Sequence, residues 1–187
     1  GFAMGLYISW TAIGGMGGRL IAGVLLDYIS WQTATSIIGA LNLLIAITFY
    51  MALPASKHFK AYPINLNRFI ESFKKNLADV KLRLLFAEGF ILMGCFVTVF
   101  NYMSYHLLEK PFELSQMWIG LISIAYLSGI YSSPRAASWS HKFGRDNVLI
   151  AMLSMMIFGL WIMLIPTLWA ILAGLLIFTF SFFAAHS

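Results

Sequence analysis

The sequence contains six long stretches of apolar residues in which charged side chains are rare. Each stretch is close to the roughly 20 residues that a helix needs to cross the hydrocarbon core of a membrane. The apolar residues follow one another without the alternation of a half-buried β-strand, so each stretch is expected to be helical. The sequence therefore predicts an all-α membrane protein with six transmembrane helices. The six stretches are Gly1–Leu26, Thr33–Leu53, Leu84–Leu107, Met117–Ser133, Val148–Ile165 and Leu168–Ala185.

The composition of the chain agrees with this fold class. Of the 187 residues, 60% are hydrophobic and 10% are charged, and the mean hydropathy is +0.83. Soluble domains carry about 25% charged residues, so a soluble domain is excluded. The single cysteine, Cys95, lies within a span and excludes an internal disulfide. Because no basic segment precedes the first span and the last span runs to Ser187, we expect an internal piece of a longer protein.

The basic residues are concentrated in two of the loops between spans. Seven of the 12 lysines and arginines lie between the second and third spans, and three lie between the fourth and fifth. This asymmetry predicts that both loops are cytoplasmic. The net charge of +5 is explained by membrane orientation, and no nucleic-acid partner is expected. The residues of the first group are Lys57, Lys60, Arg68, Lys74, Lys75, Lys81 and Arg83, and those of the second are Arg135, Lys142 and Arg145.

The loop between the second and third spans divides the chain into three parts. Residues 1–54 hold two spans, residues 55–83 form a cytoplasmic central loop, and residues 84–187 hold four spans. The first part of the loop contains Pro54 and Pro63 and is predicted to be irregular. The second part has apolar residues at helical spacing, which predicts an amphipathic helix along the inner membrane surface, with a solvated lead-in to the third span as the alternative. These apolar residues are Ile70, Phe73, Leu77, Val80 and Leu84.

The first span carries glycines around an arginine, in the stretch GGMGGRLIAGVLLD. Small residues at four-residue spacing let another helix backbone approach closely. A charge in hydrocarbon is costly, so Arg19 is expected to have either of two roles. It is a structural residue held by carbonyls or a partner carboxylate, or it acts directly at a substrate or proton site. The small residues are Gly14, Gly18 and Ala22, with Gly15 and Gly23 beside them.

The third span carries four polar residues on one helical face, Thr98, Asn101, Tyr102 and Tyr105. Polar side chains inside a membrane avoid lipid, so this face is expected to line the bundle interior or a wet cavity. Hydrogen bonding between helices is the alternative role.

Other intramembrane polar residues give weaker signals. In the fourth span Ser123 and Tyr126 are further candidates for the cavity. Glu88, a carboxylate near the cytoplasmic end of the third span, is interpreted as a snorkelling side chain, with proton coupling as the alternative.

Motifs for bond chemistry are missing from the sequence. It contains no G-x-x-x-x-G-K-[ST] phosphate-binding loop, no histidine and cysteine spacing typical of a metal site, and no nucleophile paired with a base. The sequence therefore predicts no enzyme, no cofactor and no metal. Movement of a solute is favoured over catalysis.

Three stretches carry a resemblance to a known family. GLYISWTAIGGMGGRLIAGVLLDYISWQ is similar to the fifth helix of the major facilitator superfamily, VTVFNYMSYHLLEKPFELSQ to the seventh, and SSPRAASWSHKFGRDNVL to the cytoplasmic loop between the eighth and ninth. Within that superfamily the chain resembles the bacterial YnfM-like group of drug or metabolite exporters. The resemblance covers essentially the whole chain as helices five to ten of about twelve. Residues 1–54 would be the last two helices of the N-terminal bundle, and residues 84–187 the first four of the C-terminal bundle.

Two motifs depart from the family pattern. The antiporter motif of helix five usually contains Gly-Pro, whereas this chain has Gly14-Gly15. The loop motif usually reads G-x-x-x-D-[RK]-x-G-R. Here Ala137 replaces the glycine and His141 the aspartate, while Lys142, Gly144 and Arg145 match the pattern.

The resemblance implies a secondary transporter that works by alternating access in the bacterial inner membrane. Proton-coupled efflux of a small molecule or drug is the first expectation, and a sugar or metabolite transporter of the same fold is the next. A non-transporting membrane scaffold or receptor is a third alternative. The expected partners are a small-molecule substrate, protons and the lipid bilayer, and the full-length protein is expected to be a monomer.

Overall fold

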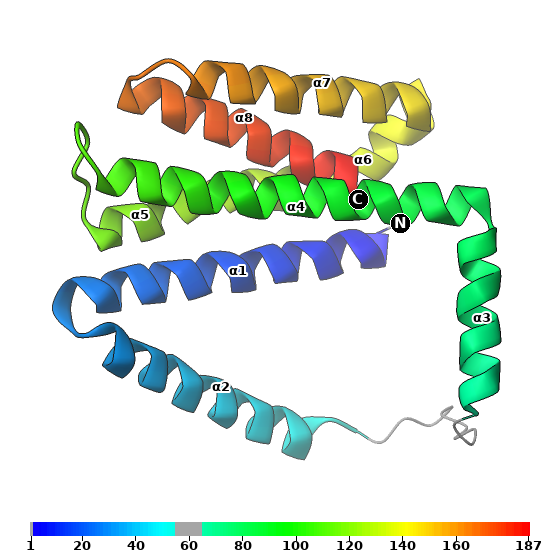
Figure 1. Cartoon of the computed structure of the whole chain (residues 1–187), viewed down its shortest axis with the longest axis horizontal. Coiled ribbons are helices and arrows are strands. Elements are labelled where there is room, and N and C mark those ends of the chain that lie inside the picture. The colour runs from blue at the N-terminus through cyan, green and yellow to red at the C-terminus, as the bar shows by residue number, and fades with distance from the viewer. Residues whose placement is uncertain (1, 55–64) are drawn as a thin grey trace. The chain divides into compact units, whose positions relative to one another are not determined.

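The computed structural model describes residues 2–54 and 65–187, and all regular structure in these ranges is helical. Within these two ranges the chain forms eight α-helices and one short 3₁₀ helix (Figure 1). The elements are α1 (Phe2–Tyr28), α2 (Trp31–Ala52), α3 (Leu66–Ala78), α4 (Val80–Leu108), α5 (Gln116–Ile122), η1 (Ser123–Ala125), α6 (Tyr126–Phe143), α7 (Arg145–Met163) and α8 (Leu168–His186).

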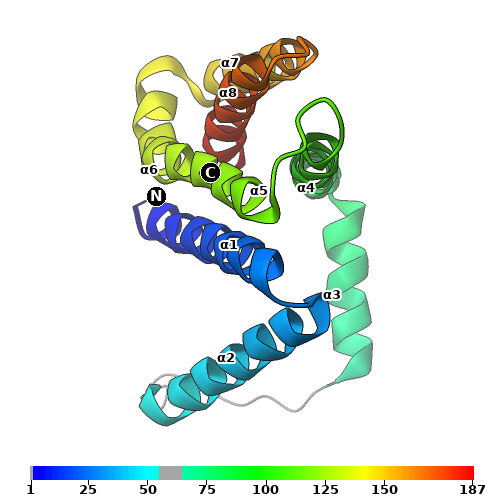
Figure 2. The same cartoon turned by 90° about the vertical axis from the view of Figure 1, so that its left-hand side faces the viewer.

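The chain divides into two compact units. One unit contains Gly1–Thr35 together with Cys95–Ser187, and the other contains Ser36–Gly94. These units do not coincide with the three parts marked on the sequence, because α1 packs against α5 and α6 (Figure 2). The start of the chain thus joins its C-terminal helices in one unit.

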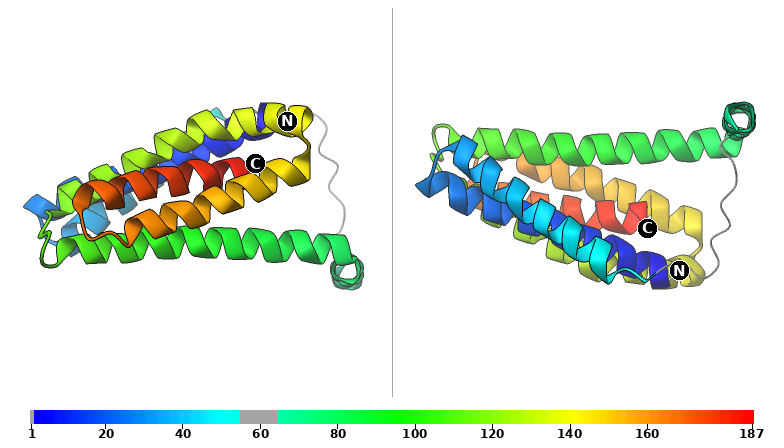
Figure 3. Two further views of the ribbon diagram at one scale, coloured as in Figure 1. Left: turned by 90° about the horizontal axis from the view of Figure 1, so that it is seen from above. Right: turned by 90° about the horizontal axis from the view of Figure 1, so that it is seen from below.

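Within the larger unit, α8 packs between α6 and α7 (Figure 3). Helices α7 and α8 run side by side in opposite directions, and their backbones approach closely where Gly159 faces Gly174. A Cβ atom on Gly159 would lie 2.8 Å from the Gly174 carbonyl oxygen, so only glycine fits there.

Aromatic rings from three helices form the core of this unit. The ring of Phe96 on α4 stacks on Phe182 of α8 with centroids 4.1 Å apart, and it lies 5.3 Å from the ring of Tyr126 on α6. Phe178 and Phe182 are almost completely buried. Such ring pairs contribute about 0.5–1.5 kcal/mol beyond the burial of their area. The part of α4 that belongs to this unit is therefore held by its aromatic side chains.

Four helices of the described part are long and apolar enough to cross a membrane, namely α2, α4, α7 and α8. The number of six spans predicted from the sequence is not confirmed. The first predicted span is one continuous helix, α1, but Arg19 and the glycines beside it lower its hydropathy. The fourth predicted span, Met117–Ser133, is divided among α5, η1 and the first part of α6.

The smaller unit contains α3, in the second part of the central loop. Its first residues are capped by the Asn65 side chain, whose oxygen accepts hydrogen bonds from the backbone N–H groups of Asn67 and Arg68. The helical pattern that the sequence shows through Leu84 is interrupted at Asp79. The Asp79 carboxylate accepts a hydrogen bond of 2.8 Å from the N–H of Lys81 and so begins α4. The loop segment predicted to be irregular, with Lys57 and Lys60, lies almost entirely outside the described residues.

Candidate functional site

Two of the intramembrane polar residues selected from the sequence meet in the larger unit. The Arg19 guanidinium on α1 donates a hydrogen bond of 3.1 Å from Nη2 to Oδ1 of Asn101 on α4, across 82 residues of sequence. The guanidinium carbon also lies 5.5 Å from the centre of the Phe100 ring, which is an attractive geometry for a cation. The arginine is half-buried. Packing thus brings together two polar groups that the sequence placed in separate spans.

This pair lies well inside both helices. Arg19 is about two turns before Asp27 near the end of α1, or ~12 Å at 1.5 Å per residue. Asn101 is about two turns before the end of α4 at Leu108, or ~10 Å by the same rise. A hydrocarbon core is about 30 Å thick, so the pair is placed away from the interface if these helices span it.

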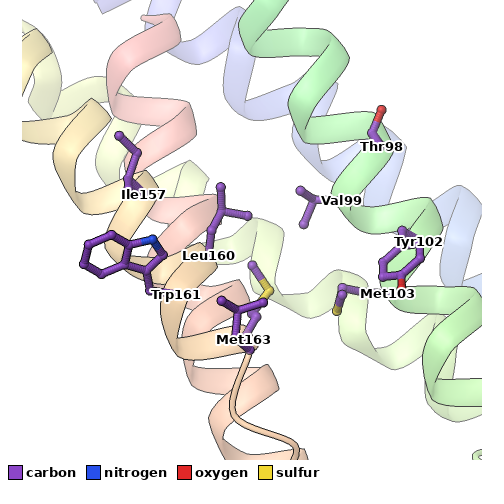
Figure 4. A pocket seen from close by; sticks show the side chains of 9 residues that line it. Thr98, Val99, Tyr102, Met103, Ile157, Leu160, Trp161 and Met163 are labelled. Carbon is purple, nitrogen blue, oxygen red and sulfur yellow. The ribbon is translucent and has the colours of Figure 1, made fainter.

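The other residues of the polar face on α4 do not share the position of Asn101. Thr98 and Tyr102 line an open cleft of about 360 Å³ between α4 and α7. In Figure 4, Val99 and Met103 point from α4 toward α7. Tyr105 is exposed and lies outside this cleft. The α7 residues of the cleft are Ile157, Leu160, Trp161 and Met163, and Leu164 follows the helix.

Ser123 and Tyr126 lie in helix contacts instead of this cleft. The Ser123 hydroxyl lies 2.6 Å from the Gly120 carbonyl oxygen and 3.3 Å from that of Met16 on α1, and both carbonyls can accept its hydrogen bond. The Tyr126 ring is buried over Gly15, where an added Cβ atom would lie 3.3 Å from a ring carbon. The absence of a side chain at Gly15 therefore makes room for this ring.

Close backbone contact between α1 and α5 occurs at Gly23. A Cβ atom on Gly23 would lie 2.5 Å from the Gln116 carbonyl oxygen, and one on Gly120 would lie 2.9 Å from the Arg19 carbonyl oxygen. Gly14 and Gly18, in contrast, have no described atom within 4 Å of such a position. Of the glycines predicted to pack, Gly15 contacts α6 and Gly23 contacts α5, because the side of α1 that carries them packs against these two helices.

Asp27, near the end of α1, has a role that no sequence motif indicated. Its two carboxylate oxygens accept hydrogen bonds from the backbone N–H groups of Gln116, at 2.9 Å, and Met117, at 3.1 Å. The residue before α5, Ser115, makes no capping bond with its own side chain. A carboxylate at a helix N-terminus is favourable because the free N–H groups and the helix dipole both attract it. The end of α1 therefore caps α5.

The described residues contain no cluster of three or more His, Cys, Asp or Glu side chains that could hold a metal ion. A family model described as the Major Facilitator Superfamily matches residues 1–187, the full length of the sequence. The chain belongs to this superfamily. Its membership agrees with apolar helices long enough to span a membrane, and it identifies a multi-pass membrane protein of a transporter family.

Individual relatives come from several bacteria. The chain is 44% identical over 186 residues to an uncharacterized transporter of Buchnera aphidicola subsp. Schizaphis graminum, covering 100% of this chain and 45% of that protein. It is 46% identical over 149 residues to the inner membrane transport protein YnfM of Escherichia coli strain K12, covering 80% and 36%. It is 36% identical over 187 residues to the uncharacterized MFS-type transporter YybF of Bacillus subtilis strain 168, covering 100% and 46%. The chain spans less than half the length of these relatives. No solved structure matches it.

The major facilitator loop motif lies where α6 passes into α7. His141 and Lys142 are in the last turn of α6, and Arg145 is the first residue of α7. Gly144 between them has a φ of +87°, a conformation that glycine adopts without the steric cost of a side chain. The motif glycine is therefore required by the turn. All four residues of the motif are exposed.

Glu88, the remaining charged candidate of this major facilitator chain, is on α4 within the smaller unit. It is partly exposed, as expected for a carboxylate near a helix end.

Proposed function

We propose that the full-length protein is a secondary transporter that moves a small molecule out of the cell by alternating access, coupled to protons, in the bacterial inner membrane. The observation that carries this proposal is the contact of Arg19 with Asn101. By the family resemblance, α1 and α4 come from opposite halves of the transporter. Substrate sites of such transporters lie near the middle of the membrane, between the two halves. A polar contact between the halves, in otherwise apolar helices, is suited to that position.

The cleft between α4 and α7 supports a substrate with an apolar part. Its lining combines the aromatic side chains of Tyr102 and Trp161 with the flexible thioethers of Met103 and Met163. Aromatic rings provide rigid contact area, and methionine adapts to differently shaped ligands. Thr98 adds a hydroxyl group at the edge. This chemistry favours an amphipathic molecule over a simple ion.

Transport is tested in inside-out membrane vesicles that contain the full-length protein. Respiration acidifies the vesicle interior, and a pH-sensitive dye reports proton release when a compound is added from a panel of drugs and sugars. We expect at least one compound to cause proton release that vesicles without the protein lack. Replacing Asn101 by Ala should reduce that release at unchanged abundance in the membrane.

Ser104→Ala is the matched control, because the Ser104 hydroxyl bonds to the Phe100 carbonyl oxygen within α4 itself. It should leave proton release unchanged. Uptake of a labelled compound without proton release would contradict proton coupling. A protein that moves no compound of the panel would support a membrane scaffold or receptor.

A further inference from the structure

The surroundings of Arg19 offer acceptors for its N–H groups but, in the part of the chain that the structure describes, no charge that neutralises it. Among the described residues, the partners that the structure gives its guanidinium are the Asn101 oxygen, the Phe100 ring and the nearby Tyr126 hydroxyl. None of these carries a negative charge. Arginine stays protonated in proteins, so the charge at this position is permanent.

The hydrogen bond from Arg19 also determines which atoms of the Asn101 side-chain amide remain available to bind another group. A guanidinium group has five N–H donors and no acceptor, so Asn101 must use its oxygen toward Arg19. The amide nitrogen of Asn101, with its two N–H groups, then points elsewhere. Arg19 retains further N–H donors, because the structure gives it one hydrogen bond to Asn101. The pair therefore presents donors from two side chains beside a fixed positive charge.

A donor-rich cationic site is complementary to an anion with two oxygens. The planar guanidinium matches a carboxylate in a bidentate arrangement, and charge-assisted hydrogen bonds are about twice as strong as neutral ones. The amide N–H groups of Asn101 would add donors from the second helix. A cationic substrate, in contrast, would be repelled by Arg19.

We propose that Arg19 and Asn101 bind a carboxylate, and that this carboxylate belongs to the transported substrate. The proposal rests on the proposed transport function and names the substrate class, an amphipathic molecule with an acidic group. A carboxylate side chain from the part of the protein outside this chain is the second possible source of the same chemistry. The two sources differ in what they predict for the protein without substrate.

The first test is made without ligand in the Asn101→Ala background, where the Arg19–Asn101 contact is absent from both proteins. It compares the melting temperature of the purified full-length Asn101→Ala protein in detergent with that of the same protein carrying Arg19→Gln as well. If the carboxylate comes from the substrate, Arg19 is unneutralised in the free protein, and the variant should melt at the same or a higher temperature. If a protein side chain supplies it, the variant leaves that carboxylate unpaired and should melt lower. A lower melting temperature overturns the assignment to substrate.

The second test measures stabilisation by ligands in matched pairs that differ in charge. The probes are benzoate with benzamide, and phenyl glucuronide with phenyl glucoside. At least one carboxylate should raise the melting temperature of the wild type more than its neutral counterpart does. Arg19→Gln should weaken apparent binding by about tenfold or more, the range expected for one charge-assisted hydrogen bond. Arg19→Lys, which keeps the charge but loses the planar fork, should weaken it less.

Equal stabilisation by both members of each pair, or by neither, overturns the carboxylate site. So does full retention of carboxylate binding in Arg19→Gln. Because melting reports binding and the vesicle assay reports transport, the two proposals fail separately. A protein that transports a neutral compound and does not bind carboxylates would contradict only the carboxylate site at Arg19 and Asn101.

Discussion

At the scale of single residues, Arg19 places a permanent charge well inside a helix of the larger unit. A guanidinium at the centre of a membrane helix costs about 2.5–3.5 kcal/mol on insertion scales. The Asn101 oxygen and the Phe100 ring reduce that cost without removing the charge. The structure therefore gives the charge a fixed position and leaves it available to an anion.

The interaction between Arg19 and Asn101 is measurable as a coupling energy. We expect Asn101→Ala to destabilise the full-length protein, because the Arg19 N–H group loses its acceptor. The same change in the Arg19→Gln background should cost less. Residues that share a hydrogen bond couple by about 0.5–3 kcal/mol, and the four proteins of this cycle would give that value from their unfolding free energies in mixed micelles. Additive effects would contradict the contact.

At the scale of elements, the contact between α1 and α5 combines a polar cap with a glycine crossing. Asp27 supplies the N-terminal cap that α5 lacks in its own sequence. One turn away, Gly23 and Gly120 allow the backbones to meet. The two features join the C-terminal end of α1 to the N-terminal end of α5, two helices that the family resemblance assigns to opposite halves.

Removing the carboxylate of Asp27 should loosen the start of α5. In Asp27→Ala the N–H groups of Gln116 and Met117 lose their acceptors, and loss of a helix cap costs about 0.5–2 kcal/mol. Hydrogen exchange at these two amides of the full-length protein should become about 2- to 30-fold faster, by the same free energy. Unchanged protection would show that the cap is not formed in the full-length protein.

The glycine crossing predicts a clear difference between two substitutions on one helix. Gly23→Ala should lower the melting temperature of the full-length protein, because the new methyl group meets the Gln116 carbonyl oxygen at 2.5 Å. Gly18→Ala is the matched control, since no described atom lies within 4 Å of its Cβ position. It should be neutral or stabilising. Equal losses in both variants would contradict the crossing at Gly23.

At the scale of the whole molecule, the distribution of charge predicts how the chain crosses the membrane. In a variant with Cys95 replaced by Ser, single cysteines at Lys75 and Lys142 should react with an impermeant thiol reagent from the cytoplasm only. A cysteine at Glu113 should react from the outside only. All three positions are exposed. Labelling of Lys75 and Glu113 from the same side would contradict the predicted topology.

The sequence was sufficient to predict helices and the family, because long apolar runs and motif residues are local signals. It did not predict the 3₁₀ turn at Ser123, which interrupts the fourth span where the hydroxyl lies 2.6 Å from the Gly120 carbonyl oxygen. A polar residue in an apolar span can be recognised locally, so Arg19 and Asn101 were both identified as candidates. Their contact, and the capping role of Asp27, depend on packing between distant segments. No local pattern contains that information.

The separation of 82 residues between Arg19 and Asn101 also has a consequence in time. A ribosome adds about 5–20 residues per second, so Asn101 is synthesised about 4–16 s after Arg19. During that interval α1 has left the ribosome while its guanidinium still lacks its amide partner. Water, lipid head groups or the insertion machinery must accommodate the charge until α4 enters the membrane. The order of synthesis therefore leaves the charge on α1 without its amide partner until α4 has been made.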